Sequence, residues 1–192
     1  MTDAVTTASA LTVRQALRAG TAATHQALDQ LWDGKSLGHR EHYVRFLAAS
    51  ADALLPIEAG LARAGMAQLL PDWPLRQRSE AIAADLAGFG LAPPRTDPAS
   101  IASRPAMLGT LYVLEGSRLG GALLLRQIQA SDDCLIHANH RYLAHGQGGG
   151  LWRSFLAGLD RADPNRAELD LMIEAARDAF GRFDTAARAA LA

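Results

Sequence analysis

A stretch of nineteen residues, 107–125 (MLGTLYVLEGSRLGGALLL), has no proline and repeats its large apolar residues at helical spacing. It nevertheless contains glycines at positions 109, 116, 120 and 121. Each glycine inside a helix costs roughly 1 kcal/mol relative to alanine, so the last three together cost about 3 kcal/mol. Because Gly116 and Gly120 are four residues apart, they share one helix face. A face without side chains allows close approach of another helix or of a flat ligand, and the spacing alone leaves both interpretations open.

The composition predicts an all-α protein. Hydrophobic residues make up 49% of the chain and aromatic residues only 6%, and alanine and leucine dominate, which favours helix throughout. A length of 192 residues suits one domain with its own core. We therefore expect a single-domain bundle of six to seven helices over residues 1–192, with residues 1–10 as a flexible N-terminus.

Periodicity and helix-terminating residues indicate where these helices lie. The predicted helices cover residues 11–32, 38–64, 75–89, about 103–130, 151–159 and about 163–190. Pro56 should kink or split the second helix. Ser103 and Pro105 are typical of a helix N-terminus and predict the start of the glycine-bearing helix. Asp163 and Pro164 predict the start of the last helix in the same way. Residues 131–150 are predicted to form an exposed connection, and the helices are expected to pack by ridges and grooves.

Charge and targeting signals exclude several classes of protein. The net charge is −1, with the 19 basic residues spread along the chain, so no nucleic-acid or anionic-membrane partner is indicated. Glu115 and Arg118 in the middle of the glycine-bearing stretch argue against membrane crossing. The N-terminal residues lack a secretory pattern, and the single cysteine, Cys134, fits a reducing compartment. The sequence thus predicts a cytoplasmic protein.

His25 is the first candidate for a functional residue. It lies on an apolar face of the first predicted helix, where a lone histidine is either a hydrogen-bonded core residue or a ligand. Arg18 precedes it by two turns, about 10 Å along the axis. Its guanidinium could pair with a carboxylate of a ligand centred on His25, or could simply be solvated.

Other chemistry is weakly supported. The spacing of Cys134, His137, His140 and His145 superficially resembles a zinc site, but all four lie in one connection without a second ligand pair. His39 and His42 have no evident third ligand. No nucleophile elbow, phosphate-binding loop or H-E-x-x-H motif is present. The sequence therefore gives little support to a hydrolase or a nucleotide-dependent enzyme.

Two runs, LRAGTAATHQALD at residues 17–29 and YVLEGSRLGG at residues 112–121, resemble the haem (heme) oxygenase family. The resemblance continues through WRSFLAGL at residues 152–159 into the aromatic-bearing last helix. The second run is most similar to the bacterial branch that supplies biliverdin to bacteriophytochromes or releases iron from haem. The resemblance implies a haem held between a proximal helix and a kinked distal helix.

The resemblance also implies roles for individual residues. His25 matches the axial ligand of the haem iron, and Gly116 and Gly120 match the distal glycines that leave room for dioxygen. Three residues fall at or near positions that face the haem propionates: Arg18, Tyr112 and Arg153. Ser117 departs from the better-known members, which have an aspartate there. A hydroxyl can hold water but cannot act as a carboxylate, so proton delivery through Arg118 or through backbone-held water is an alternative.

The activity implied is oxidation of haem b, both substrate and cofactor, by O2 and an external reductant to biliverdin, carbon monoxide and ferrous iron. A ferredoxin or flavodoxin with its reductase is the expected electron donor, and a bacteriophytochrome is a possible recipient of biliverdin. One alternative is a haem storage or delivery protein that shares His25 and Arg18 but does not degrade haem. Another is a helical domain that binds no haem and keeps His25 in its core.

Overall fold

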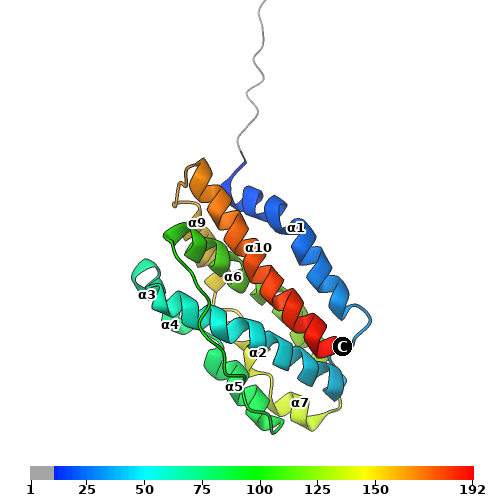
Figure 1. The fold of residues 1–192 in the computed structure, drawn as a ribbon. Helices are drawn as coiled ribbons and strands as arrows, with labels where there is room; N and C mark the ends of the chain where they lie inside the picture. The colour runs from blue at the N-terminus through cyan, green and yellow to red at the C-terminus, as the bar shows by residue number, and fades with distance from the viewer. Residues whose placement is uncertain (1–10) are drawn as a thin grey trace, which may run out of the picture.

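The structure, a computed structural model, describes residues 11–192, and within that range it is all-helical (Figure 1). The prediction of a flexible segment at residues 1–10 lies outside the described residues. The helices are α1 (Val13–Trp32), α2 (Arg40–Arg63), α3 (Met66–Leu69), α4 (Trp73–Arg76), α5 (Ser79–Gly88), α6 (Arg104–Gln129), α7 (Cys134–Ala138), α8 (Arg141–Ala144), α9 (Leu151–Leu159) and α10 (Arg166–Leu191). Six have nine or more residues, which agrees with the predicted number, and four are single short turns.

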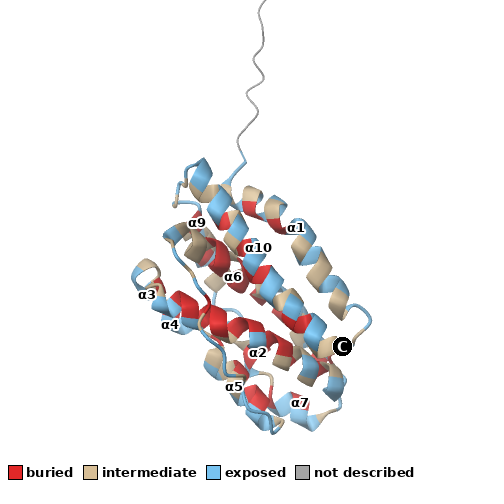
Figure 2. Cartoon of the chain, viewed as in Figure 1, coloured by how far each residue is buried: buried red, intermediate tan, exposed pale blue. Residues whose placement is uncertain are grey.

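Helix α10 is the centre of the packing, with α6, α1 and α2 against it (Figure 1). The core, red in Figure 2, is formed mainly by α2, α6 and α10. Helix α2 buries twelve of its residues, whereas α1 buries only Leu17 and Thr21. Most of the surface of α1 is therefore not covered by the described part of the protein.

Local capping explains where three of the long helices begin. Thr12 forms a capping box with Gln15 at the start of α1. The side chain of Ser103 accepts a hydrogen bond from the backbone of Ala106, so the predicted start of α6 is confirmed. The predicted cap of α10 is wrong, because Asn165, two residues after Asp163, caps the helix through a capping box.

The predicted helix over residues 75–89 is also wrong, because it is divided into α4 and α5. Glu58 of α2 is 1% exposed, and its carboxylate accepts hydrogen bonds from the backbone N–H groups of Arg78 (2.8 Å) and Ser79 (2.9 Å). This carboxylate replaces the local cap at the start of α5. A cap supplied from twenty residues away leaves no local sequence signal.

Residues 131–150 are not merely an exposed connection, since they contain α7 and α8. Ile136, Tyr142 and Leu143 point into the core. Asp85 of α5 is fully buried and accepts hydrogen bonds from the backbone of Arg141 (3.0 Å) and of Tyr142 (2.8 Å). These bonds fix α8 against α5.

Pro56 does not split α2, which continues from Arg40 to Arg63. Among residues 11–192, no helix has the length and apolar character needed to cross a bilayer.

Candidate functional site

The glycines of α6 serve two different purposes. A Cβ on Gly109 would overlap the backbone of Met172, so this glycine permits the close crossing of α6 and α10. Among the atoms of residues 11–192, a Cβ on Gly116 would meet only the ring of Trp152, at 3.8 Å, and one on Gly120 would have no atom within 4 Å. Close packing between helices therefore explains Gly109 but not Gly116 or Gly120.

The side of α6 that carries these two glycines is apolar and uncovered. Leu119 and Leu123 are 59% and 60% exposed and lie on the same side of the helix as Gly116 and Gly120. We call these four residues the glycine–leucine face. Because contiguous apolar surface on a soluble domain is a sign of a binding site, this face is suited to a flat apolar ligand.

His25 is on the surface of α1, with 60% of its side chain exposed. The alternative that places His25 in the core is therefore wrong. Its Nδ1 lies 2.9 Å from Oδ2 of Asp29, and its ring meets Phe180 of α10 edge-on, with the centroids 5.5 Å apart. An Nδ1–H donated to Asp29 leaves the lone pair of Nε2 free, which is the usual arrangement of a metal-binding histidine.

The residues expected to face propionates lie partly together. Burial raises the pKa of the half-buried Tyr112 hydroxyl, and the nearby charges of Arg14 and Arg18 oppose this increase. The Tyr112 ring is 5.6 Å from that of Trp152, which in turn lies beside Gly116. The structure thus brings Arg18, Tyr112 and the glycine–leucine face to one region.

Arg18 and Arg153 are exposed, and within residues 11–192 neither forms an ion pair. Arg153 directly follows Trp152 in α9, and α9 packs against both α1 and α6. Cations without a carboxylate partner at this end of the molecule are available to an anionic ligand.

The hydroxyl of Ser117 both donates and accepts a hydrogen bond within the protein. It donates to the carbonyl oxygen of Leu114 at 2.8 Å and accepts from Nη1 of Arg78 at 3.1 Å. Arg78 is 4% exposed, and its Nε has no hydrogen-bond partner in the described structure. Ser117 therefore retains only acceptor capacity toward a ligand or a water molecule.

Arg118 does not face the same region. Its guanidinium donates to Glu115 through Nε (3.1 Å), to the carbonyl oxygen of Arg76 through Nη2 (2.6 Å) and to that of His145 through Nη1 (3.0 Å). These partners lie on the buried side of α6. The structure consequently contradicts the alternative in which Arg118 delivers protons at the glycine–leucine face.

A buried ionic network that was not predicted from the sequence lies behind α6. Arg76 and Glu115 are each 1% exposed and are joined by a 2.7 Å ion pair. Asp72 and the hydroxyl of Ser154 accept further bonds from the same guanidinium. The pairing of Glu115 with Arg118 inside an apolar helix was the available signal, because buried charges must be paired.

The zinc-like spacing does not produce a metal site. No group of three potential ligands comes together within residues 11–192, and His145 instead has its Nδ1 3.2 Å from Nη1 of Arg118. His39 and His42 stack edge-on, and no further metal-ligating side chain joins them.

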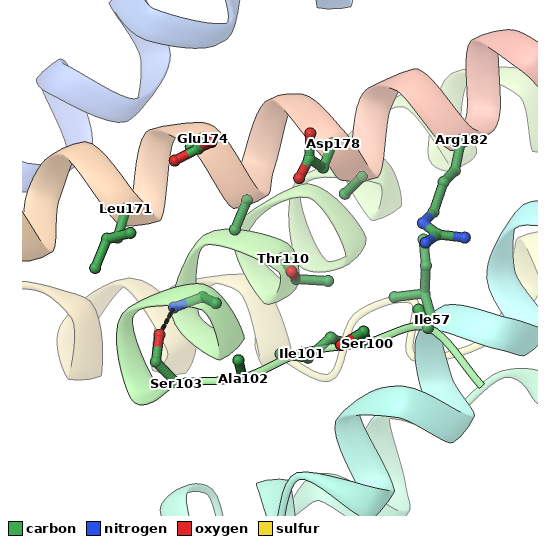
Figure 3. A pocket seen from close by; sticks show the side chains of 14 residues that line it. Ile57, Ser100, Ile101, Ala102, Ser103, Thr110, Leu171, Glu174, Asp178 and Arg182 are labelled. Carbon is green, nitrogen blue, oxygen red and sulfur yellow. Dashed lines mark hydrogen bonds between the residues drawn. The ribbon is translucent and has the colours of Figure 1, made fainter.

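A cavity of about 250 Å³ lies elsewhere in the described residues. It is bounded by α10 and by the segment that leads into α6, and it contains none of the predicted site residues (Figure 3).

An exposed imidazole on one helix and an uncovered glycine-bearing face on another define a helical protein suited to a flat, metal-centred ligand. The family to which this protein belongs follows from its similarity to known proteins. The sequence model described as "Heme oxygenase" matches residues 11–189, and the chain belongs to the heme oxygenase family. It is therefore a haem-degrading oxidoreductase by family, with haem as its substrate.

Two curated relatives have the same name. The chain is 35% identical over 167 residues to "Heme oxygenase PigA" of Pseudomonas aeruginosa, with 83% of each protein covered. It is 32% identical over 113 residues to a heme oxygenase of Xanthomonas campestris pv. campestris, covering 59% of this chain and 68% of that one.

Solved structures agree with the fold. The heme oxygenase of Neisseria meningitidis, solved with NO and CO bound, superimposes with a TM-score of 0.78 and 26% identity, covering 94% of this chain and 92% of the other. The heme oxygenase of Leptospira interrogans gives a TM-score of 0.69 at 18% identity, covering 92% and 98%, and supports the fold alone.

Proposed function

We propose that this chain, as one haem oxygenase domain, uses O2 and an external reductant to convert haem b into biliverdin, carbon monoxide and ferrous iron. The observation that carries the proposal is the uncovered glycine–leucine face of α6 together with the exposed His25 of α1, the helix whose Arg18 lies near Tyr112 of α6. Haem, once bound, supplies the iron at which dioxygen is activated. The protein's part is to bind the ring, orient it and shape its surroundings.

We assign the axial position to His25. Its Nε2 is free to coordinate, and Asp29 on Nδ1 would hold the orientation of the imidazole. Phe180 supports the ring edge-on.

Gly116 and Gly120 would allow the macrocycle to approach the backbone of α6 on the opposite side. Because no atom lies within 4 Å of a Cβ at position 120, the space that a side chain would fill is open. Leu119 and Leu123 would contribute apolar contact to the ring.

Arg18, Tyr112 and Arg153 are assigned to the propionates. Two exposed guanidiniums that have no ion-pair partner among residues 11–192 suit two carboxylates, and the hydroxyl of Tyr112 can donate a further hydrogen bond. Ser117, whose proton is committed to Leu114, would accept from a water molecule in the distal space and would not itself supply a proton. A ferredoxin or flavodoxin with its reductase is the proposed electron donor, and a bacteriophytochrome a proposed acceptor of biliverdin.

The test is a titration of the purified protein with hemin, with wild type beside His25→Ala, followed by ascorbate in air. We expect one-to-one binding with a sharp Soret band, an altered band in the variant, and conversion by wild type to a biliverdin spectrum. Haem that binds through His25 but survives the reductant would favour the alternative of a storage or delivery protein. Absence of saturable binding would contradict both.

A further inference from the structure

Helix α1 is held in place mainly by α10. The two run side by side in the same direction, and α1 buries only Leu17 and Thr21 (Figure 1). Besides Leu17, the half-buried side chains of Val13, Leu28 and Trp32 pack against the core. Specific contacts with α10 add to this apolar packing near His25.

Three such contacts follow one another along the α1–α10 contact. A Cβ on Gly20 would lie 2.6 Å from Cγ2 of Ile173, so the side chain of Ile173 fills the space beside this glycine. Nε of Arg177 donates a 2.7 Å hydrogen bond to the carbonyl oxygen of Gly20. Phe180 then meets the ring of His25. Residues 173, 177 and 180 share one face of α10.

The bond from Arg177 is unusual in kind. Both ion pairs that α10 forms in the described residues lie within that helix: Arg166 pairs with Asp170, and Arg188 pairs with Asp184. Arg177 instead crosses to a backbone carbonyl of α1 that already belongs to the helical ladder. This exposed bond joins α10 to α1 five residues before His25.

We infer that Arg177 is a positioning residue for the axial ligand: by bonding to Gly20, it holds α1 so that His25 presents Nε2 to the haem iron. The inference rests on the proposed function, in which His25 is that ligand.

The test compares Arg177→Leu with Arg177→Lys, which keeps a donor, and with Arg188→Leu, which removes an exposed arginine whose hydrogen-bond partner, Asp184, lies on α10 itself. In the haem-free protein, hydrogen exchange should accelerate in the α1 amides of Arg177→Leu and remain unchanged in Arg188→Leu. In the haem complex, we expect haem to dissociate roughly 3- to 10-fold faster from Arg177→Leu, with partial rescue by lysine.

The deciding measurement repeats the dissociation assay in a His25→Ala background. If Arg177 acts through His25, its replacement should have little further effect there. An equal, additive effect in both backgrounds, or unchanged exchange in α1, would overturn the inference while leaving the proposed function intact. A wild-type protein that fails to bind hemin would instead contradict the proposed function itself.

Discussion

Replacement of Gly120 by alanine should stabilise the haem-free protein and weaken its binding of haem. Glycine in a helix interior is less stable than alanine by about 0.5–1 kcal/mol, and a Cβ at position 120 meets no atom within 4 Å. The full gain should therefore be realised. For a domain of this size it corresponds to an increase in the melting temperature of roughly 1–4 °C, measurable by circular dichroism.

In the proposed haem complex, the same methyl group would occupy space that the macrocycle requires. Overpacking by one carbon costs about 1–3 kcal/mol, so hemin affinity should decrease roughly 5- to 150-fold. Affinity is measured from the Soret absorbance in a hemin titration of Gly120→Ala beside wild type.

Gly109→Ala is the matched control on the same helix. Its Cβ would overlap the backbone of Met172, so it should lower the free energy of unfolding by about 1–3 kcal/mol without entering the glycine–leucine face. If Gly120→Ala destabilises the haem-free protein, the face is covered in solution. If Gly120→Ala leaves hemin affinity unchanged, haem does not approach α6 at Gly120.

Three further predictions concern other parts of the molecule. His25→Ala should change the free energy of unfolding of the haem-free protein by less than about 0.5 kcal/mol in urea, because its side chain is 60% exposed. Glu115→Gln should cost roughly 3–5 kcal/mol in the same assay, because it removes the carboxylate that pairs with the buried Arg118 and leaves the buried Arg76 paired with Asp72 alone. Burial, and then the charge of Arg118, lower the pKa of His145 below 6.5, so the unfolded chain binds the proton first and stability is lost as the pH falls from about 6.5 through the folded pKa. His145→Gln should flatten this part of the stability–pH curve, and an unchanged slope would show that another group titrates there.

Local patterns predicted the long helices well, because their caps and apolar periodicity are encoded within a few residues. Ser103 caps α6 where the sequence placed its start. The division between α4 and α5 could not be predicted, because the group that caps α5 is Glu58 on another helix. Asn165 was missed in favour of Asp163, although a polar residue followed by a glutamate three positions later was present in the sequence.

The candidate site was predictable only in part. Helical spacing showed that Gly116 and Gly120 share a face, but it could not show that no helix covers that face. For His25 the same periodicity was misleading, since an apolar stripe on α1 does not reveal whether protein or ligand will cover it. Arg78 was missed because it lies in the link between two helices, where periodicity carries no information. The ligand roles themselves remain predictions.

The two sides of α6 have different roles: the buried side stabilises the fold, and the exposed side is the proposed haem-binding surface. On one side Glu115 joins Arg76 and Arg118 in buried, charge-assisted bonds that fix the helix within the protein. Because this side and the crossing at Gly109 already hold the helix in place, the opposite side can remain bare at Gly116 and Gly120 without loss of the fold. Substitutions on the two sides should therefore separate: Glu115→Gln should lower stability, whereas Gly120→Ala should raise stability and lower haem affinity.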